Sequence, residues 1–288
     1  MSSRASLATV LALILSLGTT PVAARDLLES GTVAPRAALE EAGEGANAER
    51  REKLHTGGIG WDISFPQCGS PFPRGGDFRI VGVNGGRAFS ANPCLGKGDD
   101  PSELRWAGMR AWLYMNTGNP RPSQTERWPV GQTWPRVCRA AFPNSPGCSF
   151  NYGWNFARDA YRTAVQAYIS LGWAEPGAKK TPVENRWWLD VETANSWREN
   201  TSRNVSALRG AVAYLERVGV RSIGFYSAPH MWTDITGGTR TFADYPSWVA
   251  GASTLNGAKH RCAGSGFTGG GVWLTQFFKS GFDANYAC

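Results

Sequence analysis

The chain has few side chains suited to binding metals and lacks the common nucleotide-binding motifs. Its three histidines, His55, His230 and His260, are widely separated, and neither C-x-x-C nor H-E-x-x-H occurs. Structural and catalytic zinc sites use such spacings, so we expect no metal and no organic cofactor. Residues 85–98 are rich in glycine but lack P-loop or dinucleotide spacing, and Ser227 is not in a G-x-S-x-G elbow. The sequence therefore disfavours nucleotide-dependent and serine-hydrolase chemistry.

Long apolar runs are also scarce. Residues 1–24 combine Arg4, an apolar run from Leu7 to Leu17 and small residues around Ala24, a pattern that predicts a secretory signal peptide. The run is shorter than the roughly 20 residues of a membrane-spanning helix, and no later segment is long enough. We therefore expect a secreted protein without a membrane anchor.

Aromatic residues are absent from residues 25–56, which are rich in Ala, Glu and Arg. Such a composition predicts a disordered or loosely helical tether or pro-segment. All 13 tryptophans and all 6 cysteines follow residue 57. We expect residues 57–288 to form one folded domain, and the protein to be a monomer.

Six cysteines in an exported chain predict three disulfides. They are Cys68, Cys94, Cys138, Cys148, Cys262 and Cys288. Six cysteines allow 15 pairings. Sequential pairing, 68 to 94, 138 to 148 and 262 to 288, is favoured because each closed loop is then short.

The formal net charge of +7 favours an anionic partner. Because the basic residues are dispersed and the protein is expected outside the cell, peptidoglycan or another anionic wall polysaccharide is favoured over nucleic acid. A surplus of charge that only keeps the protein soluble is the alternative.

Seven short apolar runs, separated by turn residues, are typical of buried parallel strands. They lie at 59–64, 78–84, 111–116, 186–192, 221–227, 246–251 and 271–277, and an eighth strand is expected around Asn285. Helical spacing occurs at 154–171 and at 205–218, the second after capping candidates Thr201 and Ser202 and before Gly219. Alternating strands and helices predict an α/β fold, an irregular TIM-type (β/α) barrel with fewer than eight helices. Helical spacing fades after residue 236, so loops or hairpins are expected between the last strands.

Residues 116–148 contain six prolines and two cysteines between a strand and a helix. A long loop after a barrel strand lies at the carboxyl-terminal rim, where active sites form. We expect a lid or a wall of the substrate site; a surface elaboration without a role is the alternative.

Asp190 and Glu192 follow the apolar run at 187–189. Residues two apart on a strand point to the same side, so both carboxyl groups face the barrel mouth. Two close negative charges raise the pKa of at least one, as a general acid requires near neutral pH. Such a pair alone also fits a structural role, for example bonding to Arg186 or Arg198.

Asp62 and Asp283 lie near the two ends of the folded domain, and barrel closure brings the first and last strands together. Four acids with aromatic neighbours Trp61, Trp187, Trp188 and Trp273 indicate a sugar site, because flat rings stack on sugars and carboxylates cleave glycosidic bonds. Trp187 has the parity of Val191, so it should face the opposite way.

Five motifs in order resemble those of the glycoside hydrolase family 25 lysozymes. They are GIGWDIS with Gln67, WLDVE at 188–192, IGFYS at 223–227, SWVAG at 247–251, and VWLTQF with GFDAN near the end. The resemblance extends over residues 58–285. The same motifs fit a remote, glycoside-hydrolase-like relative of that family equally well. It implies an N-acetylmuramidase that cleaves peptidoglycan by a substrate-assisted or retaining route.

The resemblance assigns Glu192 as the acid/base and Asp190 as its partner, which orients the acetamido group or stabilises charge. Asp62 and Asp283 match accessory acids, and Gln276 matches a terminal glutamine. Further candidates for binding sugar are Tyr114, Asn116, Tyr226, Trp188 and Asn84.

Several positions depart from the family pattern: VGVNGG at 81–86, YMN at 114–116, and the two residues between Trp273 and Gln276. These changes favour an alternative, a non-catalytic barrel that binds cell-wall glycan without turnover. A third alternative, a scaffold, requires Glu192 to be buried and paired with an arginine.

Overall fold

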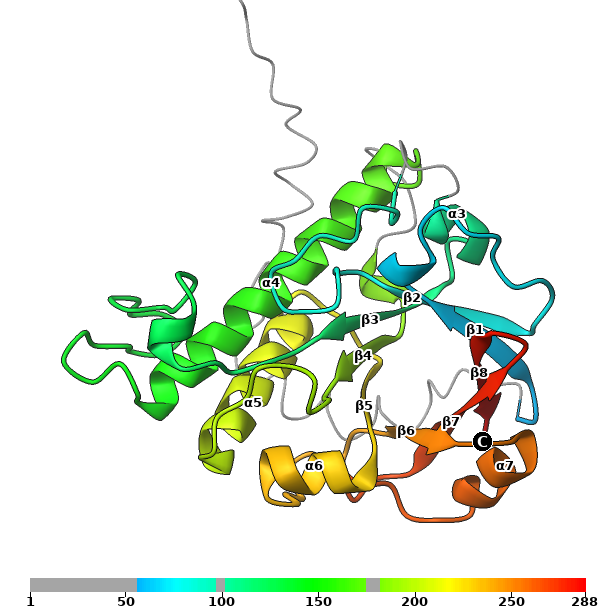
Figure 1. Cartoon of the computed structure of the whole chain (residues 1–288). Coiled ribbons are helices and arrows are strands. Elements are labelled where there is room, and N and C mark those ends of the chain that lie inside the picture. Colours follow the sequence, from blue (N-terminus) through cyan, green and yellow to red (C-terminus); the bar gives the residue numbers. More distant parts are fainter. Residues whose placement is uncertain (1–55, 97–101, 175–181) are drawn as a thin grey trace, which may run out of the picture. The chain divides into compact units, whose positions relative to one another are not determined.

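The computed structural model describes residues 56–96, 102–174 and 182–288. The predicted signal peptide and nearly all of the predicted tether lie outside these residues. Eight strands form one closed barrel in chain order (Figure 1). They are β1 (Ile59–Ile63), β2 (Phe78–Gly82), β3 (Trp112–Asn116), β4 (Trp187–Asp190), β5 (Ile223–Ser227), β6 (Ser247–Ala252), β7 (Val272–Lys279) and β8 (Phe282–Ala287). The predicted irregular (β/α) barrel is confirmed.

The last strand runs against the other seven and is joined to β7 by a hairpin, in keeping with the loss of helical spacing after residue 236. Strands β1 to β7 pair in parallel, but β8 runs antiparallel to both β7 and β1. Ser280 and Gly281, with φ of 52° and 85°, form the turn between β7 and β8. Two turn residues at positive φ make a tight hairpin, so no crossover helix intervenes.

Five α-helices occur in the described residues, fewer than eight as expected. They are α3 (Glu103–Ala107), α4 (Pro146–Ser170), α5 (Thr201–Arg217), α6 (Pro229–Thr236) and α7 (Leu255–Cys262). Short 3₁₀ helices lie at Phe65–Gln67, Pro122–Gln124 and Pro182–Glu184. No helix in these parts of the chain is both long and apolar enough to cross a membrane.

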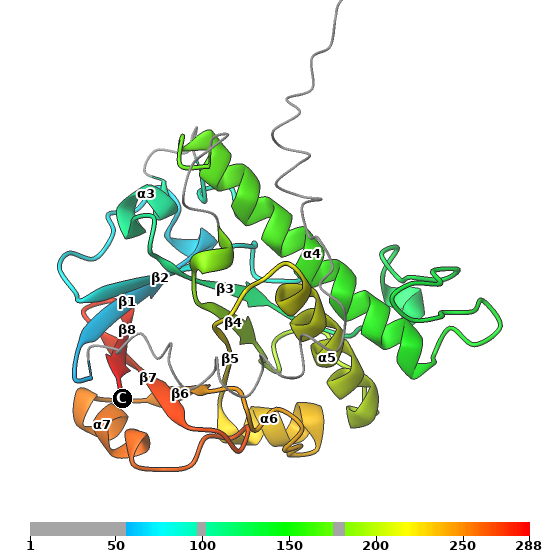
Figure 2. The ribbon, with the colours of Figure 1, turned by 180° about the vertical axis from the view of Figure 1, so that it is seen from behind.

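Helix α4 begins eight residues before the apolar periodicity, at Pro146, because Ser145 caps its first turn by accepting a bond from the Cys148 amide. It packs closely on α5, as both views show (Figures 1 and 2). A Cβ atom at Gly153 would lie 1.7 Å from the Ala207 carbonyl oxygen, and one at Gly210 would lie 1.9 Å from that of Phe150. Both positions therefore require glycine.

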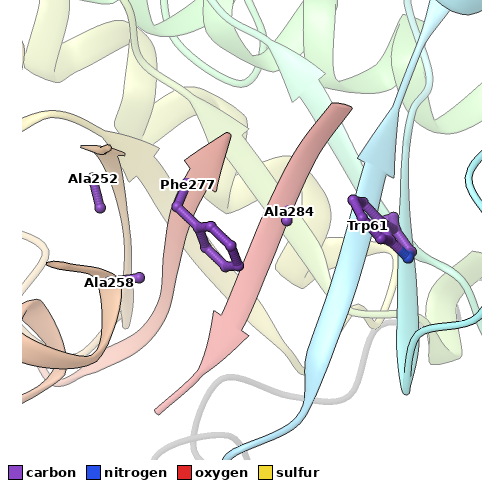
Figure 3. Close-up of a cluster of buried hydrophobic side chains, with 5 residues drawn as sticks. All are labelled: Trp61, Ala252, Ala258, Phe277 and Ala284. Atoms are coloured by element: carbon purple, nitrogen blue, oxygen red, sulfur yellow. The ribbon is translucent and has the colours of Figure 1, made fainter. Parts of the chain in front are cut away.

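Apolar side chains form two layers. The barrel interior is filled by Ile80, Trp188, Trp248, Leu274 and Ala287. An outer cluster joins β1, β6, β7 and β8 to α7, and consists of Trp61, Ala252, Ala258, Phe277 and Ala284 (Figure 3). Strand alternation sends neighbouring residues to these two layers.

The three disulfides are those predicted, Cys68–Cys94, Cys138–Cys148 and Cys262–Cys288. The second joins the long insertion to the first turn of α4, and the third joins the end of α7 to Cys288. Each limits the freedom of the unfolded chain.

The insertion between β3 and α4 packs mainly along α4. The Trp128 ring stacks on Tyr152 at 5.1 Å, and Trp134 meets Trp154 edge-on at 4.9 Å. Its first residues approach the loop after β4, since the Asn119 amide donates to the Ser196 carbonyl oxygen. A role for the insertion as a substrate wall stays a prediction.

Candidate active site

Polar side chains gather at the carboxyl ends of β1, β3, β4, β5 and β7, one layer above the apolar barrel interior. Asp62, Asn116, Asp190, Tyr226 and Gln276 share the strand face that points inward. Trp188 lies two residues before Asp190, and Leu274 lies two residues before Gln276. Both belong to the apolar cluster that fills the barrel interior. The alternation of each strand therefore places the polar layer at the mouth.

Asp190 is held rigidly at the end of β4. The Asn116 side-chain amide donates a hydrogen bond to Asp190 Oδ2. Asn116 is itself fixed by Asn84, whose Oδ1 accepts from the Asn116 backbone N–H at 2.9 Å. The Thr117 hydroxyl donates to the Asp190 carbonyl oxygen at 2.6 Å. Asp190 is 3% exposed, and the bonds from Asn116 and Thr117, at the end of β3, determine its orientation.

Glu192 follows two residues beyond the end of β4 and is half-buried. The Trp197 indole N–H donates to the Glu192 carbonyl oxygen at 2.8 Å and anchors this turn of the loop. Neither Arg186 nor Arg198, the arginines considered as structural partners, lies beside the carboxyl group of Glu192. Arg186 lies between the rings of Trp112 and Trp273 at the start of β4, and Arg198 lies over Trp128.

Asp62 stands directly opposite Asp283 in the β1–β8 register. Its carboxyl group accepts from Asn285 Nδ2 at 2.5 Å and from Gln276 Nε2 at 3.3 Å. The Trp248 indole donates to Asn285 Oδ1 at 2.8 Å. Because an indole N–H can only donate, it turns the amide so that the NH₂ group faces Asp62.

Negative charge accumulates in this layer. Burial, followed by the charge of Asp283, raises the pKa of Asp62 to about 8. Burial and then the charge of Glu192 raise the pKa of Asp190 well above its ordinary value, while the Asn116 bond opposes the shift. Burial also raises the pKa of Glu192 and, at the more exposed rim, that of Asp283.

The pair formed by Asp190 and Glu192 therefore keeps a proton to higher pH than an isolated carboxyl group. A hydrogen bond between the two side chains favours the protonated Asp190 and the ionised Glu192. Among the described residues, Asp190 Oδ1 is buried and receives no bond from an amide, hydroxyl or indole donor.

The structure brings together most of the predicted site residues. Burial raises the pKa of both Tyr114 and Tyr226. The charge of Asp62 raises that of Tyr114 further, and the charge of Glu192, followed by that of Asp190, raises that of Tyr226. The Tyr226 hydroxyl donates to Gln276 Oε1 at 2.8 Å. Asn84 supports Asn116 from a buried position.

The prediction that Trp188 contacts sugar is wrong. Its side chain is 0% exposed and packs on Trp248 in the barrel interior, where Gly224 leaves room for the ring. It lies one inward position below Asp190 and is covered by the polar layer. Trp187 faces outward against Tyr161, as its parity predicted.

Sequence reasoning missed the contributions of Asn285, Trp248 and Phe278. Asn285 stands in GFDAN two residues from Asp283, so strand parity could have placed it in the site. Trp248 lies beneath Tyr226, with ring centroids 4.5 Å apart. Phe278 lies two residues beyond Gln276 and is exposed.

No group of three or more histidine, cysteine, aspartate or glutamate side chains in the described ranges is arranged to hold a metal ion. The chemistry available at the mouth is that of carboxyl groups, amides and phenols. Such a site can protonate a leaving oxygen and stabilise positive charge that develops nearby.

Comparisons with known proteins extend this description. Residues 177–275, which include Asp190 and Glu192, match the family model "Lysozyme-like protein 1". A "Probable GH family 25 lysozyme 4" of Dictyostelium discoideum is 29% identical over 101 residues. The alignment covers 35% of this chain and 44% of the relative, so the chain spans less than half the length of this curated relative.

Two solved structures are similar in arrangement. The muramidase from Trichobolus zukalii is 18% identical, with 80% of this chain and 93% of that chain covered and a TM-score of 0.49. A family GH25 lysozyme from Aspergillus fumigatus is 15% identical, with 81% and 94% covered and a TM-score of 0.46.

Proposed function

Because the chain is related to the glycoside hydrolase family 25 lysozymes, we propose that it is an exported glycoside hydrolase that cleaves the glycan strands of peptidoglycan. Glu192 is the general acid and base, and Asp190 is its partner. Asp62, Asp283, Tyr114, Asn116, Tyr226 and Gln276 line the substrate site.

The observation that carries this proposal is the placement of a half-buried Glu192 two residues beyond a fixed, buried Asp190, with burial raising the pKa of both carboxyl groups. A general acid must be protonated near neutral pH and must reach the substrate. Burial supplies the raised pKa, and the position of Glu192 beyond the strand end supplies access. Asn116 keeps Asp190 in one orientation while Glu192 changes protonation.

In this proposal the carboxylate of Asp190 accepts a hydrogen bond from the acetamido N–H of an N-acetylated sugar. This hydrogen bond favours ionised Asp190, so the shared proton moves to Glu192. Glu192 then protonates the glycosidic oxygen as the bond to the anomeric carbon breaks. The acetamido carbonyl oxygen attacks that carbon and forms a cyclic oxazolinium ion, a known departure from the two-carboxylate scheme.

In the second step, water attacks the anomeric carbon and the ring of the intermediate opens. Ionised Glu192 accepts the proton of that water, which restores the starting state. The carboxylate of Asp283, at the more exposed rim, stabilises in its ionised form the positive charge that develops on the sugar. The proposed stereochemical outcome is retention of the anomeric configuration.

Features outside the mouth also support an extracellular wall substrate. Three disulfides suit an oxidising compartment. The formal charge of +7 favours association with an anionic polymer such as peptidoglycan.

The decisive experiment is mass spectrometry of soluble fragments from purified peptidoglycan incubated with residues 25–288. Wild-type protein should release fragments ending in reducing N-acetylmuramic acid, and Glu192→Gln should release none. The melting temperature of the variant shows whether it is folded. If both proteins bind the wall without releasing fragments, the hydrolase is overturned and the non-catalytic glycan-binding barrel replaces it.

A further inference from the structure

Phe278 has an unusual position for an exposed aromatic residue. Its side chain is 64% exposed. Of the exposed large apolar side chains in the described parts of the chain, it is the one that lies within a barrel strand. Single exposed apolar residues are common on protein surfaces, so the direction of the ring decides whether it has a role.

The β7–β8 hairpin has two distinct faces. Phe277 belongs to the outer cluster with Trp61 (Figure 3). The Lys279 ammonium lies over the Trp61 ring at 5.8 Å, and the Phe282 ring meets Trp61 at 6.3 Å. These contacts close the outer face of the hairpin against β1. Because residues alternate along a strand, Phe278 points to the other face.

That other face carries the acids. Gln276, two residues before Phe278, donates to Asp62. Phe278 is paired with Asp283 across the hairpin, and Asp283 is paired with Asp62 across the next strand pair. The ring therefore stands at the rim of the mouth beside a carboxyl group, in line with the site residues.

We propose that Phe278 is a stacking platform for one pyranose ring of the glycan strand, in a subsite next to Asp283. The apolar C–H face of the sugar lies on the phenyl ring, and Asp283 accepts a hydrogen bond from a hydroxyl or amide of the same sugar. The inference rests on the proposed function for the class of ligand, a glycan strand, but it does not require turnover.

Binding is measured separately from cleavage by placing every variant in a Glu192→Gln background. The probe is a set of peptide-free glycan strands prepared from peptidoglycan, titrated by calorimetry. Phe278→Ala should raise Kd about 3- to 10-fold, the effect of losing one aromatic contact worth about 0.5–1.5 kcal/mol. Phe278→Trp should keep Kd within about twofold, whereas Phe278→Leu should resemble alanine if a flat ring is needed.

Met109→Ala is the matched control, because this side chain is also exposed, at 40%, but precedes β3 at the opposite rim. It should leave Kd unchanged. If the Glu192→Gln parent and its Phe278→Ala derivative bind the strands with equal Kd, the stacking platform is overturned, even if wild-type protein cleaves peptidoglycan. If Phe278→Ala binds the strands more weakly and wild-type protein does not cleave peptidoglycan, the platform is supported and only the hydrolase is rejected. A parent that does not bind the strands overturns the platform.

Discussion

Near the amino-terminal end of the barrel, the described residues include a buried cation, Arg186. Arg186 is 8% exposed, and its guanidinium lies 4.6 Å from the ring centroids of both Trp112 and Trp273. At the carboxyl end, the buried charges are acids of like sign, Asp62 and Asp190, surrounded by amide donors. Aromatic faces stabilise a cation without changing its protonation, whereas clustered acids respond by holding protons.

This difference separates a stabilising end from a reactive end of one barrel. Substitutions at the amino-terminal end should lower the free energy of unfolding but leave the activity per folded molecule unchanged. Changes at the carboxyl end should alter activity or its pH dependence and affect folding less.

The largest effect is expected at Glu192. Glu192→Gln should reduce hydrolysis of peptidoglycan about 10²- to 10⁴-fold, because an amide cannot donate the proton that a general acid supplies. Its melting temperature should stay close to that of the wild type, since the side chain is half-buried and the loop is anchored through the backbone. A variant with full activity contradicts the assignment of the acid.

The second effect is the pH dependence of the free energy of unfolding that Asp62 causes. Its pKa rises from 3.8 to about 8 on folding, so the folded protein binds more protons than the unfolded chain between these values. The free energy of unfolding should therefore fall as pH rises from about 4 to about 8, by on the order of a few kcal/mol. Denaturant unfolding at several pH values measures the slope, and Asp62→Asn should flatten it. An unchanged slope in the variant means that other groups cause it.

The third effect tests the opposite end of the barrel. Arg186→Met should lower the free energy of unfolding by about 1–3 kcal/mol, because two cation–π contacts and the bond from Arg186 Nε to Ser222 Oγ are lost. Activity per folded molecule should be nearly unchanged. A stable but inactive Arg186→Met variant breaks the proposed division between the two ends.

The smallest of these effects is expected at Asn116. Asn116→Ser shortens the side chain and removes the amide donor that favours ionised Asp190, so the pKa of Asp190 should rise further. Activity near neutral pH should fall about tenfold, and the alkaline limb of the pH–rate profile should move to higher pH. A uniform loss of activity without a shifted limb indicates a structural role only.

Much of the fold was predictable because strands and helices leave local patterns. Each of the seven apolar runs became a barrel strand, and Gly219 follows α5 at a φ of 93°, as the predicted helix end required. The sequential disulfides were predictable because short loops close easily. The fading helical spacing after residue 236 allowed hairpins between the last strands, but the direction of β8 itself depends on the tight turn at Ser280 and Gly281.

The acids of the site were predictable from the sequence. How far below the barrel mouth the neighbouring side chains lie was not. Strand parity indicates that Asp190 and Trp188 face the same way, but not that Trp188 lies beneath the polar layer. Depth depends on the stagger between strands and on the small Gly224 beside the indole ring. Asn285 and Phe278 became site candidates once the register of β8 with β1 and β7 was known.

The sequence by itself determined the strand runs, the spacing of the carboxyl groups along their strands and the set of cysteines, because these follow from local periodicity and composition. Tertiary structure alone decided that Asp62 faces Asp283, that Asn116 reaches Asp190, and that Trp61 closes the outer face of the β7–β8 hairpin. Each of these contacts joins residues far apart in the chain. The raised pKa values that accompany them depend on burial and on neighbouring charges, which exist only after the barrel closes.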